Sequence, residues 1–352
     1  MKRLLVGTVL CLALAVVPAS AGDDKTISIT LDAWAADVGG LFFLGAQDET
    51  CPGLTGCGTV TQGIMSLDDA GTVPAFAVSW VNGSGSGVTV SYYDVDEMGP
   101  FSSLLTDDNS TFARAHEENF FSDHGDWWEG AVGLEMSNVS VEWTHTTSSS
   151  DKGSWQVSFG INNVDYEQTD QQFMNNLHDF GFQPNETSRE YGITIVSEFE
   201  GIGPSVGFSG NQKLGDSGLE FIGNVKFSVL VGDSDISYTS FFDPTGLSAV
   251  VNPTSMVAGD LDGDGFHDIF GPVNDPDLDF TFNTDGTAFS FDTTIGLTYG
   301  FDFGLSLRLG YRAAMHQNMP TLDINDDLLI GEQFDTRDVT LSGVFFGAGW
   351  TF

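Results

Sequence analysis

The sequence predicts an all-β fold: a transmembrane antiparallel β-barrel of about ten strands, with twelve as the alternative, and long acidic extracellular loops. Apolar and polar residues alternate at period two over segments of about 9–11 residues, the length that a tilted strand needs to cross a bilayer. After the N-terminal segment, no apolar run approaches the ~20 residues of a membrane helix. The chain holds 29 Phe, 43 Gly and 7 Trp with almost no helical periodicity. Since only helices and closed barrels span membranes, a barrel is expected.

The first 21 residues have the layout of a secretory signal peptide. Lys2 and Arg3 precede the apolar run LLVGTVLCLALAVVP, and small residues end at Ala21, as at a cleavage site. A lipid anchor would need a small residue directly before the cysteine, whereas Leu10 precedes Cys11. We therefore expect residues 1–21 to be removed and residues 22–352 to form a single barrel domain.

The charge of the exported chain limits its partners. Of the eleven Lys and Arg, nine remain without Lys2 and Arg3, against 50 Asp and Glu, for a formal charge of −41 with His neutral. Such a surface repels phosphates, which excludes nucleic acid. Small solutes or cations are the expected partners.

Ten segments carry the strand pattern. The clearest is 219–231, where Phe221, Val225 and Phe227 share one face and Glu220 and Lys226 share the other. A single strand of this kind also fits a soluble sandwich, but the export signal and the repeated hairpin pattern favour a barrel. In chain order the segments are about 26–36, 75–81, 87–95, 131–145, 154–165, 191–209, 219–231, 287–301, 303–313 and 337–352.

The segments between the strands alternate in length. Short ones, such as NGSGSG and NQKLGDSG, alternate with long polar ones at about 37–74, 96–130, 166–190, 232–286 and 317–336. This alternation is typical of bacterial outer-membrane barrels, whose short turns are periplasmic, so both termini are expected at the periplasm. Twelve strands would result if 232–286 hid a hairpin such as DISYTSFF. The apolar phase slips at residues 137–138 and 200–201, which predicts β-bulges.

The last strand ends on Phe352. Val344, Phe346 and Trp350 share its face, so the terminal aromatic is expected in the interfacial girdle. A final strand that ends in Phe is similar to the signal that the barrel-assembly machinery reads in bacterial outer-membrane proteins. We therefore expect this machinery as a partner, and outer-membrane lipid and lipopolysaccharide as the surroundings.

The stretch SEFEGIGPSVGFSGNQKLGDSGLEFIGNVKFSVLVGD (197–233) resembles a block of the Legionella-type major outer-membrane protein family. The resemblance continues in LRLGYRAAMHQN and RDVTLSGVFFGAGWTF, and it covers most of the chain after about residue 130, without the long loops. It implies an outer-membrane barrel with a pore-forming role. Its most distinctive element, Gly201 to Pro204, is assigned to folding.

One loop contains a calcium-binding pattern. Carboxylates occupy positions 1, 3, 5 and 9 of an EF-hand-like loop, with Gly265 at position 6. Gly271 replaces the usual Glu at position 12, so weak Ca²⁺ binding is expected, with a Kd of about 10⁻⁴–10⁻³ M. The alternative is an acidic, solvated loop, because residues 232–286 hold eleven Asp and no Lys or Arg. The candidate ligands are Asp260, Asp262, Asp264 and Asp268.

Two further loop patterns are less specific. Cys51 and Cys57 are spaced C-x5-C, which in an oxidising compartment favours a disulfide over a metal site, because no His lies nearby to complete a tetrahedral set. A second cluster could bind a metal or form a hydrolytic centre, although such residues in a polar loop are usually solvated. It consists of His116, Glu117, Asp123, His124 and Asp126.

Charged residues are expected inside the barrel. Such charges mark a water-filled lumen or a salt-bridged plug, and ten strands enclose only a narrow bore. We favour porin-like passage of small solutes or ions, without enzymatic activity; the alternatives are an outer-membrane hydrolase and a non-conducting structural or adhesive barrel. The predicted pore-lining residues are Glu220, Lys226, Asp292, Arg308 and Arg312, with Asp32 and Glu198 as companions.

Overall fold

The computed structural model describes most of the chain and shows an all-β fold. The described residues are 25–49, 60–67, 69–99, 102–105, 110–112, 120–122, 127–178, 187–243, 279–322 and 334–352. Among them, no helix has the length and apolar character needed to cross a membrane. The expected signal peptide, Cys51 and Cys57 lie outside the described residues.

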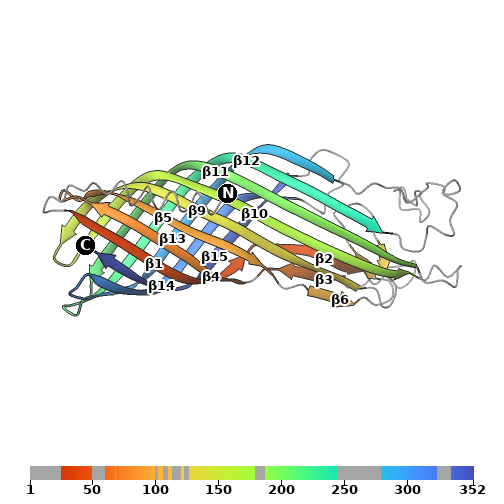
Figure 1. Ribbon diagram of the computed structural model, residues 1–352, viewed down its shortest axis with the longest axis horizontal. Helices are drawn as coiled ribbons and strands as arrows, with labels where there is room; N and C mark the ends of the chain where they lie inside the picture. The colour runs from red at the N-terminus through yellow and green to blue at the C-terminus, as the bar shows by residue number, and fades with distance from the viewer. Residues whose placement is uncertain are drawn as a thin grey trace.

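Ten antiparallel strands close into a barrel, as the sequence predicts (Figure 1). Each predicted segment corresponds to one barrel strand, and DISYTSFF continues a strand instead of forming a hairpin. On the loop side, several strands extend beyond the predicted segments, and four of them are longer than 23 residues. They are β1 (Thr26–Gly39), β4 (Asp69–Val81), β5 (Ser86–Met98), β9 (Trp127–Ser150), β10 (Gly153–His178), β11 (Thr187–Lys213), β12 (Leu219–Asp243), β13 (Asp279–Gly300), β14 (Leu305–Leu322) and β15 (Phe334–Thr351).

The first and last strands close the barrel. β1 pairs with β15 over its length, from Ser28 opposite Thr351 to Gly39 opposite Thr340. Beyond this ladder, the Phe352 amide donates to the Ile27 carbonyl at 2.9 Å. The terminal residue is therefore part of the barrel seam.

Short turns gather at the end that holds Phe352 (Figure 1). In the β4–β5 turn, the Asn82 side chain accepts bonds from the amides of Ser84 and Ser86 at 3.0 Å. Gly85 in the same turn has φ of 79°, a left-handed conformation that favours glycine. This end has the short connections of a periplasmic side.

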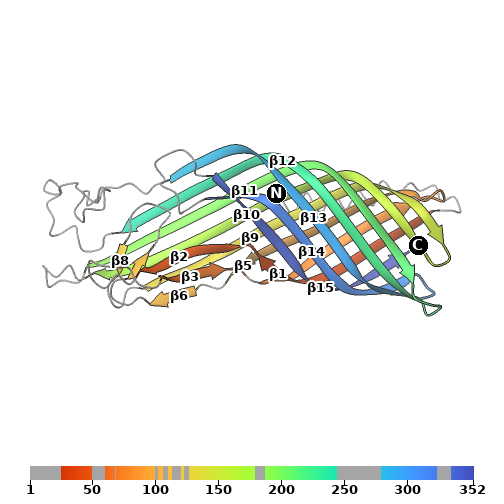
Figure 2. The same ribbon diagram turned by 180° about the vertical axis from the view of Figure 1, so that it is seen from behind.

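Shorter strands lie at the opposite end (Figures 1 and 2). β2 (Phe42–Glu49), β3 (Val60–Ser66), β7 (Ser110–Phe112) and β8 (Phe120–Ser122) form a separate four-stranded sheet. β6 (Ser102–Leu105) pairs with the loop end of β9. The first two long connections therefore contain strands of their own.

Part-way along each barrel strand, the apolar residues change from the outward face to the inward face. Near the turns, outward residues are large and apolar, such as Phe227 and Ile295, and we call this part the membrane-level half. Toward the loops the pattern reverses: Asp233 points outward on β12, while Ile236 and Tyr238 are buried inside. We call this part the outer half. The apolar outside of the membrane-level half matches a lipid-facing band, and the outer half rises above it into water.

This exchange explains the slips in the apolar pattern, so the predicted β-bulges at residues 137–138 and 200–201 are wrong. Strand pairing continues through both positions without a shift. The apolar residues change face because the outside surroundings change from lipid to water. Register shifts occur elsewhere, between Ala35 and Asp37, beside Trp155, and between His316 and Met319.

Two rows of carboxylates cross the outside of the outer half, and their residues are at least partly exposed. Carboxylates directly opposite on neighbouring strands repel by about 0.2–1 kcal/mol a pair, and water at this surface weakens that repulsion. The row nearer the membrane holds Asp165, Glu200, Asp233 and Asp285 on β10 to β13. The second holds Asp96, Glu135, Glu167, Glu198 and Asp235 on β5 and β9 to β12.

The interior of the outer half is filled by a cluster of buried apolar side chains, which we call the apolar core. All ten barrel strands contribute to it, so it extends around the whole circumference. Trp34 and Tyr93 pack edge to face, with ring centroids 5.9 Å apart, a favourable arrangement for aromatic pairs. Its largest side chains, all less than 2% exposed apart from Tyr93 at 2%, include Trp34, Tyr93, Tyr166, Phe199, Tyr238 and Phe345.

Candidate functional site in the barrel interior

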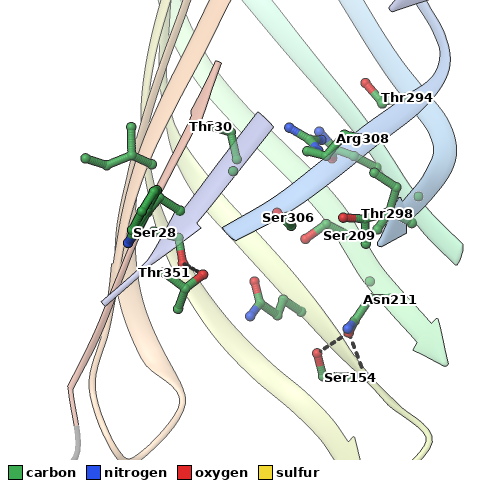
Figure 3. A pocket seen from close by; sticks show the side chains of 18 residues that line it. Ser28, Thr30, Ser154, Ser209, Asn211, Thr294, Thr298, Ser306, Arg308 and Thr351 are labelled. Carbon is green, nitrogen blue, oxygen red and sulfur yellow. Dashed lines mark hydrogen bonds between the residues drawn. The ribbon is translucent and has the colours of Figure 1, made fainter. Parts of the chain in front are cut away.

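A polar cavity of about 390 Å³ lies inside the turn end of the barrel; we call it the vestibule. Its side chains come from strands on several sides of the barrel and point into a shared space (Figure 3). Ser154 Oγ donates to Asn211 Oδ1 at 2.7 Å on this wall. The lining is rich in hydroxyl and amide groups: Ser28, Thr30, Ser154, Gln156, Ser209, Asn211, Asn224, Thr294, Thr298, Ser306 and Thr351, together with Arg308.

A layer of charged residues follows the vestibule toward the loops. Arg308 donates to both carboxylate oxygens of Asp32, at 2.9 and 3.2 Å, and Arg312 donates to Asp292 at 2.5 Å. Lys226 stands directly opposite Asp292 on the neighbouring strand and is only 6% exposed. We call this the charged layer: Asp32, Glu142, Lys226, Asp292, Arg308 and Arg312.

The charged layer holds three acidic and three basic groups, so its formal charges balance. Glu142 lies within electrostatic range of both Lys226 and Asp292. Inside a barrel, charges are costly unless they are paired or wetted, and two ion pairs, Arg308–Asp32 and Arg312–Asp292, join four of these six residues. It therefore forms a network instead of a field of one sign.

Arg312 connects the charged layer to the apolar core. Its guanidinium carbon lies 5.0 Å from the ring centroid of Trp34 and 4.7 Å from that of Tyr93, within cation–π range. Tyr93 Oη in turn lies 2.8 Å from His316 Nε2 in a buried hydrogen bond. One side chain thus contacts a carboxylate and two core aromatics.

A family comparison identifies the class of protein. The model of one family, described as Legionella pneumophila major outer membrane protein precursor, matches residues 79–352, which is more than half of the chain. The chain belongs to this family. It is therefore an outer-membrane protein, in agreement with the lipid-facing band on its barrel. No curated protein matches the sequence significantly.

Solved structures similar to this Legionella-type protein are outer-membrane proteins of low identity. The outer membrane protease OmpT of Escherichia coli is 11% identical, with 95% of this chain and 99% of that chain covered and a TM-score of 0.43. The toluene transporter TodX of Pseudomonas putida is 6% identical, with coverages of 94% and 90% and a TM-score of 0.29. A Pseudomonas aeruginosa FadL homologue is 9% identical, with the same coverages and TM-score.

The structure of this family member places the five predicted interior residues on the inner face. Lys226, Asp292, Arg308 and Arg312 belong to the charged layer, whereas Glu220 lies nearer the turns and accepts a bond from Asn211. The expectation for Glu198 is wrong: it is exposed on the outer face, because the interior positions of β11 at this level are those of Phe199 and Ser197.

Sequence reasoning missed Glu142 and the apolar core of this Legionella-type barrel. Glu142 alternates with outward Val141 and Trp143, so the period-two pattern could have placed it inside. The apolar residues of the core could have been assigned to the interior by continuing the same inward–outward alternation along each strand, beyond the last lipid-facing residue. A strand of about 25 residues is longer than the bilayer requires. The part of the barrel beyond the bilayer therefore needs side chains of its own to fill its interior.

The candidate loop sites of this family member lie outside the described residues. These are the calcium pattern at Asp260, Asp262, Asp264 and Asp268, and the cluster from His116 to Asp126. Among the residues that the structure does describe, no group of three or more His, Cys, Asp or Glu could hold a metal ion. Both loop sites stay predictions.

Proposed function

We propose that this outer-membrane protein is a barrel that stays closed at rest and holds its long acidic loops above the membrane as a structural or adhesive surface. The observation that supports this is the apolar core: side chains from all ten strands meet across the interior with exposed fractions of 8% or less. Packed apolar side chains exclude water as a protein interior does. A solute that enters the vestibule therefore meets a seal about half-way along the barrel.

The second candidate is porin-like passage of small solutes or ions, and the vestibule favours it. This cavity offers hydroxyl and amide groups next to a charged layer, as a path for hydrophilic solutes would. The family resemblance implies the same role. Passage would require the apolar core to move aside. Neither candidate involves a catalysed reaction; a hydrolase would depend on the loop cluster from His116 to Asp126.

Conductance of the refolded protein in planar bilayers distinguishes the two candidates. For the closed barrel we expect no stepwise channels from the wild type, and channels from a Trp34→Ala, Tyr93→Ala, Phe199→Ala variant, because these side chains fill the core. Thr298→Ala in the vestibule is the matched control and should stay silent. Gel mobility with and without heating checks that each variant is folded.

Wild-type channels would instead support solute passage. They should then favour cations at low salt, because the acidic loops raise the local cation concentration. The preference should fade in concentrated salt, since the Debye length falls from about 8 Å at physiological ionic strength to about 3 Å at 1 M. If the core variant is folded and forms no channels, the apolar core is not the seal.

Calcium binding by the loop that begins at Asp260 is a separate proposal. The clustered carboxylates repel one another unless a cation joins them, so calcium should order the loop. We expect millimolar calcium to slow proteolysis within 244–278 in the wild type and to have no effect in an Asp262→Asn, Asp264→Asn variant. Heat stability of the barrel should stay the same. Equal cleavage of the wild type in calcium and in chelator would contradict the site.

Phe352 and the surrounding lipid define the other proposed partners. The barrel-assembly machinery would recognise the β15 strand, whose outward face ends in Trp350 and Phe352, with rings stacked at 6.0 Å. Lipid would contact the apolar outside of the membrane-level half. Lipopolysaccharide would meet the barrel on the side of the long loops.

A further inference from the structure

A set of buried polar atoms between the charged layer and the apolar core lacks hydrogen-bond partners within the protein. These are Nδ2 and Oδ1 of Asn162, Nδ2 of Asn138, and the hydroxyl oxygens of Ser205 and Ser228. The four residues are 0–5% exposed. We call them the polar layer. Most buried polar groups in folded proteins have a partner, so five such atoms in one region require an explanation.

The polar layer lies on one wall of the barrel. Ser205 on β11 stands directly opposite Ser228 on β12, and Asn162 on β10 stands opposite Ser140 on β9. Ser140 accepts a bond from Lys226 of the charged layer at 3.2 Å. The polar layer is therefore continuous with the charged layer on its turn side.

On β10 and β12 the apolar core begins at the next inward position toward the loops, whereas Asn138 on β9 stands opposite the core residues Val164 and Tyr93. Leu230 follows Ser228 on β12, and Val164 follows Asn162 on β10, and both are fully buried. The polar layer thus has the vestibule and the charged layer on one side and the apolar core on the other. Water can reach it only from the vestibule if the core is closed.

Neighbouring side chains cover these atoms: Glu142 lies beside Ser205 and Tyr93 beside Asn138, but without the geometry of a hydrogen bond at Ser205 Oγ or Asn138 Nδ2. A buried donor or acceptor without a partner loses the hydrogen bond that water gave it in the unfolded chain, and this loss favours any small movement that admits water. Phe199 and Ser158 already occupy the space in front of the inward glycines 201 and 207 of β11, so room for water has to come from side-chain movement. Rotation of the serine and asparagine side chains is the smallest such movement.

We propose that water enters the polar layer from the vestibule and stops at Leu230 and Val164, so that the barrel contains a blind hydrated pocket. This inference rests on the proposed closed barrel. It extends the hydrophilic interior from the vestibule past the charged layer, and it locates the seal in the apolar core alone. Small hydrophilic molecules that pass the charged layer would bind at the hydroxyl and amide groups of this wall.

Cysteine labelling along the inward face of β12 tests the proposal. In a Cys51→Ser, Cys57→Ser background, the variants Asn224→Cys, Ser228→Cys and Ile236→Cys sample the vestibule, the polar layer and the core. A small, charged, membrane-impermeant thiol reagent is added to the protein refolded in lipid vesicles. We expect Asn224→Cys to react first and Ser228→Cys to react about tenfold or more faster than Ile236→Cys, which reacts only after local opening.

The outcomes separate this inference from the proposed function. Equal, slow reaction of Ser228→Cys and Ile236→Cys would overturn the hydrated pocket and leave the closed barrel intact. Fast reaction of all three variants would overturn the closed barrel itself, and wild-type conductance would then accompany it.

A stability measurement gives a second test that needs no cysteine. If the hydroxyls of Ser205 and Ser228 are hydrated, the Ser205→Ala, Ser228→Ala variant should unfold at the same urea concentration as the wild type. If they are dry and unpaired, their removal should raise the midpoint, which would overturn the proposal. Ser91→Ala is the matched control: its hydroxyl bonds to Ser140 at 2.7 Å, so its loss should lower the midpoint.

Discussion

Replacement of Arg312 by alanine is expected to destabilise the folded barrel by about 3–5 kcal/mol, the loss typical when one partner of a buried ion pair is removed. Asp292, whose side chain is only 4% exposed, would lose the guanidinium that pairs with it. The change would also remove the guanidinium that packs on Trp34 and Tyr93. Urea unfolding of the refolded protein in lipid, followed by tryptophan fluorescence, measures the effect.

Arg308→Ala is the matched control for this change. Its partner Asp32 has a side chain that is 17% exposed, and Arg308 itself lines the vestibule, so water can solvate the remaining carboxylate. We expect a loss nearer the ~1 kcal/mol of a solvated pair. Equal losses for the two variants would mean that the charged layer is wet throughout and that Arg312 has no special connection to the core.

Arginine on the lipid-facing side of β13 is expected to cost about 2–4 kcal/mol at Ile295, the range for a basic residue near the bilayer midplane on a barrel. Ile295 points outward and is 54% exposed, in the middle of the apolar band. Asp285→Arg lies on the same face of the same strand, but in the outer half. It should cost nothing, and it should relieve repulsion with Asp233, which stands opposite.

Unfolding in lipid vesicles checks both β13 variants. Because the outward face is apolar in the membrane-level half and polar in the outer half, the two variants should differ strongly in their free energy of unfolding, although both place arginine on the outward face of β13. If Asp285→Arg were as destabilising as Ile295→Arg, hydrocarbon would extend over the outer half, and the assignment of the membrane level would be wrong.

The strands could be predicted because the bilayer imposes a simple rule on one face. In the membrane-level half most outward positions are apolar, so Phe221, Val225 and Phe227 identify both the strand and its orientation. The rule ends where the lipid ends. At residues 137–138 and 200–201 the sequence shows a change of phase, and from the pattern alone a change of surroundings is indistinguishable from a bulge.

The candidate site was only partly predictable. Alternation places Lys226, Asp292 and Arg312 inside, but the pairing of Arg312 with Asp292 and its contact with Trp34 depend on strand register and on which strands meet across the interior. Register is set by the closed barrel as a whole. Alternation continued beyond the lipid-facing residues indicates which apolar side chains point inward, but which of them meet in the apolar core depends on the same register, because they come from ten strands.

The carboxylate rows on the outer half bear on how fast the barrel can enter its membrane. A barrel that inserts from the periplasmic side must carry Asp165, Glu200, Asp233 and Asp285, and then the second row, through hydrocarbon before they reach water. Each charged group raises the barrier while it is in transit, so unassisted insertion should be slow even though the inserted state is stable. The same barrier opposes extraction of the inserted barrel from the membrane. Once the rows have crossed, they hold the barrel in place kinetically, and its lifetime in the membrane is set by a rate instead of by an equilibrium.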